Sequence, residues 1–474
     1  MGRILGPRAR TRQVPSSAER SVSNGQTPAR RIRSAPTPRP PTENDRIRIA
    51  FEPILHSSFV RCAFFLLWLG CASFPSAADS KRPSYDVDYT VAFLPADGVA
   101  AVTITTEARS GHVSRLRLRM PKSRYSAVEG DGQIVRDGKY IVWEPPRKGG
   151  SLRYRYRVDH ERRSGGFDAR MTEDWVIVRG DDLIPSASVR ATRDADSRAR
   201  LKFSLPEGWT NVDTPFVMAQ NGKEFVVVDP SRRFDRPKGW IIAGKVGTRR
   251  EWIEDTEVSV AGPKGEDVRR NDTLAFVNLT LPQMKRAFGE LPSKLLIVSA
   301  RDPMWRGGLS GPRSLFLHAD RPLISENGTS SLVHELVHVV TRLRGADDDD
   351  WIVEGLAEFY SVELMRRAGL LSKARHEKAL DWMRDYGKPV HRLSANRSSG
   401  RVTARAVMLL DALDGEIRAR TDDDASLDDV TQALMKKREV SRRDLAELVE
   451  KLTGEPSEVL ASPLLDAGLV PSSD

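Results

Sequence analysis

Two histidines with a glutamate between them have the residue types and the spacing of a metal site. His334 and His338 lie four residues apart, and Glu335 directly follows the first of them. Leucines and valines recur at helical spacing through residues 331–343, which predicts an apolar-faced helix that Gly345 ends. Residues four apart on a helix lie one above the other, so both imidazoles could bind one ion. The alternative interpretation is that both are ordinary polar-face residues.

Such a metal site needs a third ligand, because a hydrolytic zinc ion takes three protein ligands and a water, and the third is often a carboxylate. Residues 351–369 also have helical periodicity and end at a glycine. Glu354 and Glu358 lie one turn apart on this helix. The connection 344–350 is short and polar, so the two helices should lie side by side with a carboxylate facing the histidines. These features predict one Zn²⁺ per chain, with Glu335 beside the ion as a general base.

The two predicted helices resemble those of a known family. The segments HELVH and WIVEGLAEFY are similar to the zinc helices of gluzincin metallopeptidases, in particular aminopeptidase N-type and glycyl aminopeptidase-type enzymes. The resemblance implies that His334, His338 and Glu354 are the zinc ligands and that Glu335 is the catalytic base. It also implies that Glu358 orients a ligand histidine. A solvent-facing Glu358 is the alternative.

The resemblance extends beyond these helices, over residues 85–470. A predicted helix at 274–291 and predicted strands at 294–300 and 313–320 precede the histidine helix, which is the element order of a thermolysin-like lobe. The resemblance also implies an edge strand that receives substrate. The residues at that place are Gly307, Gly308, Leu309 and Ser310.

Three departures from the family pattern bear on activity more than on metal binding. The connection between the second histidine and the third ligand is a few residues shorter than in aminopeptidase N-type enzymes. Ser310 stands where these enzymes have a glutamate that recognises the free amino group, so this charge pairing is missing. The family also has a tyrosine that stabilises the oxyanion, and the matching stretch 400–410 has none. Tyr386, His391 and Arg405 remain as alternative substitutes.

Residues 85–262 have the pattern of β-structure, because apolar and polar residues alternate in many short runs. Asp137 and Gly138 form the turn of a predicted hairpin. Together with the helices, these runs predict an α+β multidomain chain, in which a β-sandwich-like domain precedes a thermolysin-like catalytic domain with a mainly helical C-terminal part. The predicted parts are an extension at 1–59, a signal peptide at 60–78, a β-rich domain at 79–265, a thermolysin-like zinc peptidase lobe at 266–400 and a helical part at 401–474.

Composition and charge exclude some classes of protein. The chain has 474 residues, of which 39% are hydrophobic, which is enough for a sizeable core. The formal net charge is +10, but residues 1–78 contain 12 arginines and 4 acidic residues, which leaves a charge of only +2 for the remainder. A nucleic-acid partner is therefore not expected. The expected partner is a peptide or protein substrate.

The N-terminal region resembles an export signal placed far into the chain. Residues 1–50 are rich in Arg, Pro and Ser, and an apolar run then begins at Cys62 and leads to small residues at 76–78. We hypothesise that translation starts near Val60 and that the mature protein is exported to the periplasm or cell envelope. The alternative is a genuine extension with an anchor at 60–74. Membrane attachment is expected only through that anchor or through lipidation of Cys71.

Two functions from different classes fit these observations. The first is an exported zinc-dependent peptidase in which Glu335 takes a proton from the attacking water. The second is a gluzincin-like envelope protein that uses the zinc ion structurally or in binding. The missing tyrosine and the missing edge-strand glutamate make the second credible, but the first is the favoured interpretation and the second is its alternative.

Overall fold

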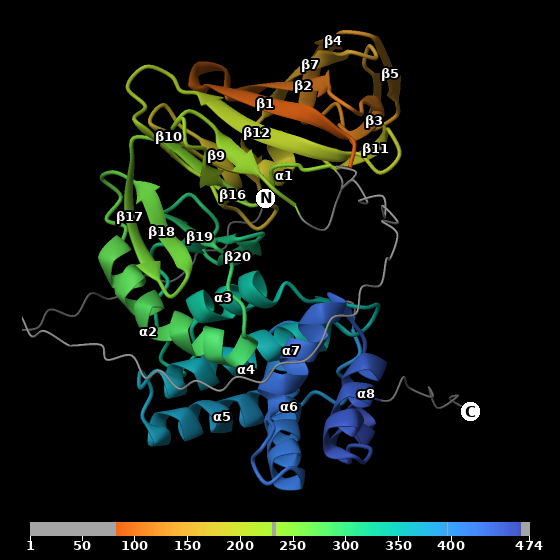
Figure 1. Ribbon diagram of the computed structural model, residues 1–474. Helices are drawn as coiled ribbons and strands as arrows, with labels where there is room; N and C mark the ends of the chain where they lie inside the picture. The colour runs from red at the N-terminus through yellow and green to blue at the C-terminus, as the bar shows by residue number, and fades with distance from the viewer. Residues whose placement is uncertain (1–81, 230–233, 396, 466–474) are drawn as a thin grey trace, which may run out of the picture. The chain divides into compact units, whose positions relative to one another are not determined.

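The computed structural model describes residues 82–229, 234–395 and 397–465 (Figure 1). The extension and signal peptide predicted at 1–59 and 60–78 lie outside these ranges, and so does Cys71. None of the helices in the described ranges has the length and apolar character needed to cross a membrane.

Alternating burial explains why the N-terminal region of the described chain forms strands. In β1 (Ser84–Leu94), every second residue from Tyr85 to Phe93 is buried. β1 pairs in parallel with β12 (Asp196–Ser204) and antiparallel with β2 (Val99–Ala108). The sheet runs in the order β14, β15, β12, β1, β2, β7, β4, and its other strands are β14 (Val217–Met218), β15 (Phe225–Val227), β7 (Gly149–Arg157) and β4 (Tyr125–Gly130).

Two smaller sheets share an apolar core with this sheet. One has the order β11 (Ala187–Ala191), β3 (Val113–Arg119), β6 (Tyr140–Glu144), β5 (Gln133–Asp137). The other has the order β13 (Asn211–Asp213), β16 (Trp240–Gly244), β10 (Trp175–Arg179), β9 (Phe167–Met171), β8 (His160–Glu161). The predicted hairpin is confirmed, because Gly138, with a φ of 54°, lies between the antiparallel strands β5 and β6. A one-turn helix α1 (Gly180–Leu183) and a 3₁₀ turn (Pro95–Asp97) also belong to this region.

A further sheet carries the candidate site. Its central strands are parallel, namely β18 (Thr256–Pro263), β19 (Lys294–Ala300) and β21 (Ser314–His318). β17 (Val246–Ile253) and β20 (Gly308–Gly311) pair antiparallel at its two edges. Every residue of β19 and β21 is buried, as expected for parallel strands that are covered on both faces. The helices α2 (Arg270–Phe288) and α3 (Ser331–Thr341) contact this sheet (Figure 1).

The sheet-rich region supports the edge strand β20 through Trp240 of β16. The indole N–H of Trp240 donates a hydrogen bond to the Leu309 carbonyl at 2.9 Å, and its backbone N–H donates to the Ser314 hydroxyl at 2.8 Å. The Trp240 ring also packs against Phe316, with 5.4 Å between ring centroids. Because Leu309 lies in β20 and the other two in β21, one buried tryptophan holds both strands of the hairpin.

The chain after β21 is mainly helical. Beyond α3 it contains α4 (Asp350–Arg367), α5 (Lys373–Gly387), α6 (Arg401–Arg420), α7 (Leu427–Lys437), α8 (Arg442–Thr453), two 3₁₀ turns (Val459–Ala461 and Pro463–Leu465) and the paired short strands β22 (Arg344–Gly345) and β23 (Glu439–Val440). The expected mixed α/β class, with a sheet-rich N-terminal region and a helical C-terminal part, is therefore confirmed.

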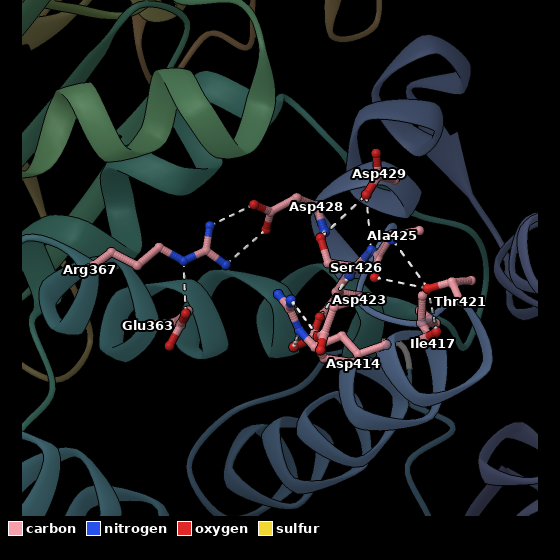
Figure 2. Close-up of polar contacts among 12 residues, drawn as sticks. Glu363, Arg367, Asp414, Ile417, Thr421, Asp423, Ala425, Ser426, Asp428 and Asp429 are labelled. Carbon is pink, nitrogen blue, oxygen red and sulfur yellow. Dashed lines mark hydrogen bonds and ion pairs between the residues drawn. The ribbon is translucent and has the colours of Figure 1, made fainter.

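Ion pairs fix the C-terminal end of α4. Arg367 donates two hydrogen bonds to the Asp428 carboxylate, at 2.6 and 3.2 Å, and one to Glu363 at 2.8 Å (Figure 2). Asp428 lies in the first turn of α7, so this fork joins the two helices. Most of α4 is also buried. A helix held in this way can keep its own carboxylates at fixed positions.

The predicted end of the histidine helix is wrong. α3 ends at Thr341, and Arg342 follows with a left-handed φ of 55°. Gly345 lies in β22 instead, where a Cβ atom would come within 2.7 Å of the Asp350 backbone. This glycine therefore permits a close approach of two chain segments. The capping position carries an arginine, so the sequence lacks the glycine that usually marks a helix end.

Candidate metal centre

The local sequence explains how α3 presents its polar residues. The Ser330 side chain accepts a hydrogen bond from the Val333 N–H at 3.3 Å, which caps the start of the helix. The leucines and valines of α3 are buried, whereas His334, Glu335 and His338 are only partly buried. The helix therefore uses its apolar face for packing and keeps one polar face for the site.

The structure brings together three of the residues predicted to bind metal. The Nε2 atoms of His334 and His338 are 3.1 Å apart, and their rings lie nearly perpendicular. The Glu354 carboxylate lies 3.5 Å from His334 Nε2 and 3.4 Å from His338 Nε2. These donor atoms all lie within 4.8 Å of one another.

This triangle has the size of a zinc site. Ligand atoms about 2.0–2.2 Å from a tetrahedral zinc ion lie about 3.3–3.6 Å from one another. The observed separations of 3.1, 3.4 and 3.5 Å are close to that range. Two imidazoles and a carboxylate are also the donor set of a catalytic zinc ion with an open fourth position. The residues therefore fit the ion that the sequence predicts.

Glu358 faces His334 and not solvent. Its carboxylate lies 2.8 Å from His334 Nδ1, one helical turn beyond Glu354. A carboxylate on Nδ1 keeps the proton there and leaves the Nε2 lone pair directed at the other two donors. The structure therefore places Glu358 where the resemblance expects an orienting carboxylate.

The protonation of the metal-free group follows from burial and from these carboxylates. Burial disfavours the charged form of His334, but hydrogen bonds that His334 donates to Glu354 and Glu358 raise its pKa to about 10. Burial and the neighbouring charge of His334 lower the pKa of His338 to about 4. The two carboxylates therefore favour a positive charge at His334, and a divalent cation would supply that charge in place of a proton.

Glu335 lies against the edge strand β20. A Cβ atom on Gly308 would come within 2.8 Å of Glu335 Cγ, so only glycine allows this approach. Ser310 lies beside the Glu335 carboxylate, where its hydroxyl and backbone N–H act to lower the pKa of Glu335. Burial nevertheless raises the pKa of Glu335. Gly307 is equally constrained, because its Cβ would lie 2.1 Å from the Trp305 ring.

A cleft of about 470 Å³ opens over the three donors. It is lined by Gly308, Leu309 and Ser310 of β20, by the polar face of α3, by residues 343–345 and by the start of α4. Arg344 is the one Arg or Lys side chain among these lining residues. The edge strand and the metal group therefore share one cleft, as the sequence predicts.

None of the three substitutes for the missing tyrosine lines this cleft. Tyr386 stacks on Trp382, with 4.9 Å between ring centroids, and the Arg401 guanidinium lies over the Tyr386 ring. Arg405 lies in α6 and His391 lies outside any helix or strand. None of these three side chains therefore lies in the cleft, where it could stabilise an oxyanion.

The acidic run before α4 is more than the solvated connection that the sequence predicts. Asp347 and Asp348 are exposed, but Asp349 and Asp350 are partly buried. Asp349 accepts a hydrogen bond from the Arg442 N–H at 2.8 Å, and Asp350 accepts one from the Ser398 N–H at 2.6 Å. Asp350 also lines the cleft. Four identical residues in a row gave no sign of which ones face inward.

A second acidic and histidine group is a weaker candidate for metal. Asp302, His318 and Asp320 also have donor atoms within 4.8 Å of one another. However, Arg306 donates to Asp302, with its Nε at 2.8 Å, and Arg301 lies 3.5 Å from Asp320. Two guanidinium groups already neutralise these carboxylates, so we assign no ion to them.

The comparisons with known proteins bear on the fold. An aminopeptidase N family protein from Idiomarina loihiensis superposes with a TM-score of 0.56, at 13% identity, over 74% of this chain and 70% of its own. An M1 zinc metallopeptidase from Deinococcus radiodurans gives a TM-score of 0.50, at 18% identity, over 82% of this chain and 94% of its own. The chain has the fold of M1 zinc metallopeptidases.

A mutant structure of the same Deinococcus enzyme gives a similar result, with a TM-score of 0.51 at 18% identity over 82% of this chain and 95% of the other. No protein-family model matches the sequence, and no curated protein matches it. At such low identity the likeness extends to the fold alone. The roles of individual residues therefore depend on the geometry of the cleft.

Proposed function

We propose that the protein is a zinc-dependent metallopeptidase that hydrolyses peptide bonds, with one Zn²⁺ per chain. The observation that supports this most is the triangle of His334, His338 and Glu354, which has zinc dimensions and lies beside an open edge strand. The M1 metallopeptidase fold of the described chain supports the same conclusion. In this proposal the sheet of β17–β21 and the helices after it form a thermolysin-like lobe.

Different residues of the chain have different roles in the proposed reaction. His334, His338 and Glu354 would hold the ion, which supplies polarisation of the scissile carbonyl and activation of a water molecule. The free edge of β20 can pair with an extended substrate, because β20 is the last strand of its sheet. Glu335 then takes a proton from the attacking water and passes it to the leaving amine. Burial raises the pKa of Glu335, which makes its carboxylate a better proton acceptor than an exposed one.

Two features bear on which peptides are cleaved. Ser310 offers a hydroxyl where aminopeptidases of this family offer a carboxylate, and that hydroxyl lies beside Glu335 in the cleft. The oxyanion must be stabilised by the ion, with Arg344 as the one Arg or Lys lining the cleft. We therefore propose a peptidase that does not depend on a free substrate amino group.

A peptide library tests this function directly. The zinc-loaded protein is incubated with peptides that have free or acetylated N-termini, and the cleavage positions are read by mass spectrometry. We expect zinc-dependent cleavage of both sets, which a chelator abolishes. If the protein binds zinc but cleaves no peptide, the alternative of a non-catalytic envelope protein replaces this proposal.

We also propose that the protein is exported, to the periplasm or the cell envelope, and acts there on peptide or protein substrates and not on nucleic acid. The apolar run from Cys62, followed by small residues at 76–78, supports this. N-terminal sequencing of the native protein is expected to start near Asp79, or at a lipidated Cys71. Recovery of residues 1–50 in the mature protein would contradict it.

A further inference from the structure

A second, larger pocket lies next to the cleft and is basic. It has a volume of about 660 Å³ and is formed by four segments: the C-terminus of α2 with the residues after it, the turn between β20 and β21, the C-terminus of α3 and the C-terminus of α7. Its lining includes the cations Arg313, Arg342, Lys436 and Arg438, and Glu290 is the one acidic side chain among the lining residues. A pocket with this balance favours an anion.

The backbone at the three arginines is unusual. Arg313, Arg342 and Arg438 have φ values of 54°, 55° and 71°. Arg313 is the second residue of the two-residue turn between Gly311 and Ser314, and the other two follow the last residues of α3 and α7. Glycine is the usual residue at such positions because it adopts positive φ without steric cost. Three arginines in place of three glycines, all on one pocket, point to a role for their side chains.

Within the described residues, no carboxylate lies within 4.0 Å of any of these three guanidinium groups. Arg313 is held by the Val228 carbonyl at 3.2 Å and by the Phe216 ring, whose centroid is 5.2 Å from its Cζ. Desolvation and the charge of Arg342 lower the pKa of Arg313, and desolvation and the charge of Arg438 lower the pKa of Arg342. The Asp229 carboxylate acts on both arginines in the opposite direction. The guanidinium groups repel one another, and a further anion between them would reduce that repulsion.

The pocket adjoins the cleft along two chain segments. The Arg342 N–H donates to the His338 carbonyl at 3.0 Å, so the pocket begins one helical turn, about 5.4 Å, beyond a metal ligand. Arg313 lies three residues after Ser310, at the end of the edge strand. The Arg344 N–H also donates to the Arg438 carbonyl at 2.9 Å. The edge strand that lines the cleft therefore leads into the turn that lines the pocket.

We propose that this pocket binds a carboxylate of the substrate peptide, so that the enzyme prefers substrates with an acidic group on the side of the scissile bond that extends toward Arg313. This inference rests on the proposed function. Arginine suits the role because its planar fork binds a carboxylate through two parallel hydrogen bonds. The carboxylate could belong to a side chain or to the C-terminus of the peptide, and the test separates these two sources.

The test measures peptide binding without turnover. The zinc-loaded Glu335→Gln protein is titrated with short labelled peptides that carry one Glu at successive positions, each beside its Gln counterpart and each with a free or an amidated C-terminus. We expect one Glu position to increase affinity about tenfold at low ionic strength, which is about 1.4 kcal/mol. A gain that follows the free C-terminus instead assigns the pocket to the terminal carboxylate. Absence of either gain overturns the proposal.

Variants of the arginines then test whether the preference for the Glu peptide depends on this pocket. Arg342→Gln with Arg438→Gln should remove the tenfold preference and leave the affinity for the Gln peptide unchanged. Arg163→Gln is the matched control, because Arg163 is also exposed and, within the described residues, has no ion pair. The preference for the Glu peptide should persist in this control variant. A preference that survives the double variant contradicts the proposal. Inorganic phosphate should compete with the Glu peptide only, and phosphate that binds without displacing it would assign the pocket to a free anion.

Glycine variants separate binding from folding. Arg342→Gly and Arg438→Gly remove the cost of positive φ, so they should raise the melting temperature while the acidic preference is lost. A purely structural role of the arginines predicts the reverse, a lower melting temperature with the preference intact. The two proposals fail in different ways. If the proposed peptidase function is wrong, the wild type shows no peptide turnover. If the anion pocket is wrong, the protein shows no binding preference for the acidic peptide.

Discussion

Glu335→Gln is expected to lower peptide turnover by about 10²- to 10⁴-fold while zinc stays at about one ion per chain. The amide keeps the size of the side chain but cannot accept the proton of the attacking water. The three donor atoms of His334, His338 and Glu354 are unchanged, so metal affinity should be retained. Turnover of a peptide from the library and zinc content by atomic emission are measured on the variant and on the wild type.

Ser310→Ala provides the control for this comparison. It removes a hydroxyl that lies beside Glu335 but leaves the base itself, so its effect on turnover should be much smaller than that of Glu335→Gln. If Glu335→Gln retained wild-type turnover, Glu335 would not be the base and the proposed division of roles would be wrong. If it lost zinc as well, the loss of turnover would be secondary to metal loss.

The metal group was predictable from sequence because it depends on local helix geometry. At about 3.6 residues per turn, residues four apart such as His334 and His338 lie on the same face of any α-helix, and the short connection to α4 restricts where Glu354 can lie. Spacing along the chain also predicts the alternating strands, and the sequence shows that spacing directly. The edge position of β20 was implied by the family resemblance and not by spacing.

Other features depend on contacts between distant segments, and sequence patterns do not report those. The close approach of Gly308 in β20 to Glu335 in α3 joins a strand and a helix that are separated by a loop. The end of α3 was misplaced because Arg342 occupies a position where glycine is expected. Arg313, Arg342 and Arg438 are spread over three elements, and only the fold brings them to one pocket. Single arginines in polar stretches gave no signal for this.

The largest effect on metal content is expected from Glu354→Gln and from the double variant His334→Ala/His338→Ala. The double variant removes both nitrogen ligands and should abolish zinc binding. Glu354→Gln replaces an anionic ligand by a weak neutral one, so most of the zinc should be lost on dialysis, and turnover should fall because the metal is absent. Zinc content and peptide turnover are measured together, beside the circular dichroism spectrum as a check of folding.

Glu358→Gln is the matched control for the third ligand, since it makes the same change one turn further along α4. It weakens the hydrogen bond to His334 Nδ1 but leaves all three donors in place, so affinity should fall by about 10- to 100-fold and zinc should be regained when the ion is supplied. Normal zinc content in Glu354→Gln would contradict the assignment. The ligand would then be Glu358 or one of Asp347 to Asp350. Of these, Glu358 contacts His334 and Asp350 lines the same cleft as the histidines, so they are the first to test. Zinc retained by the double histidine variant would place the ion elsewhere in the chain and end the proposal for this cleft.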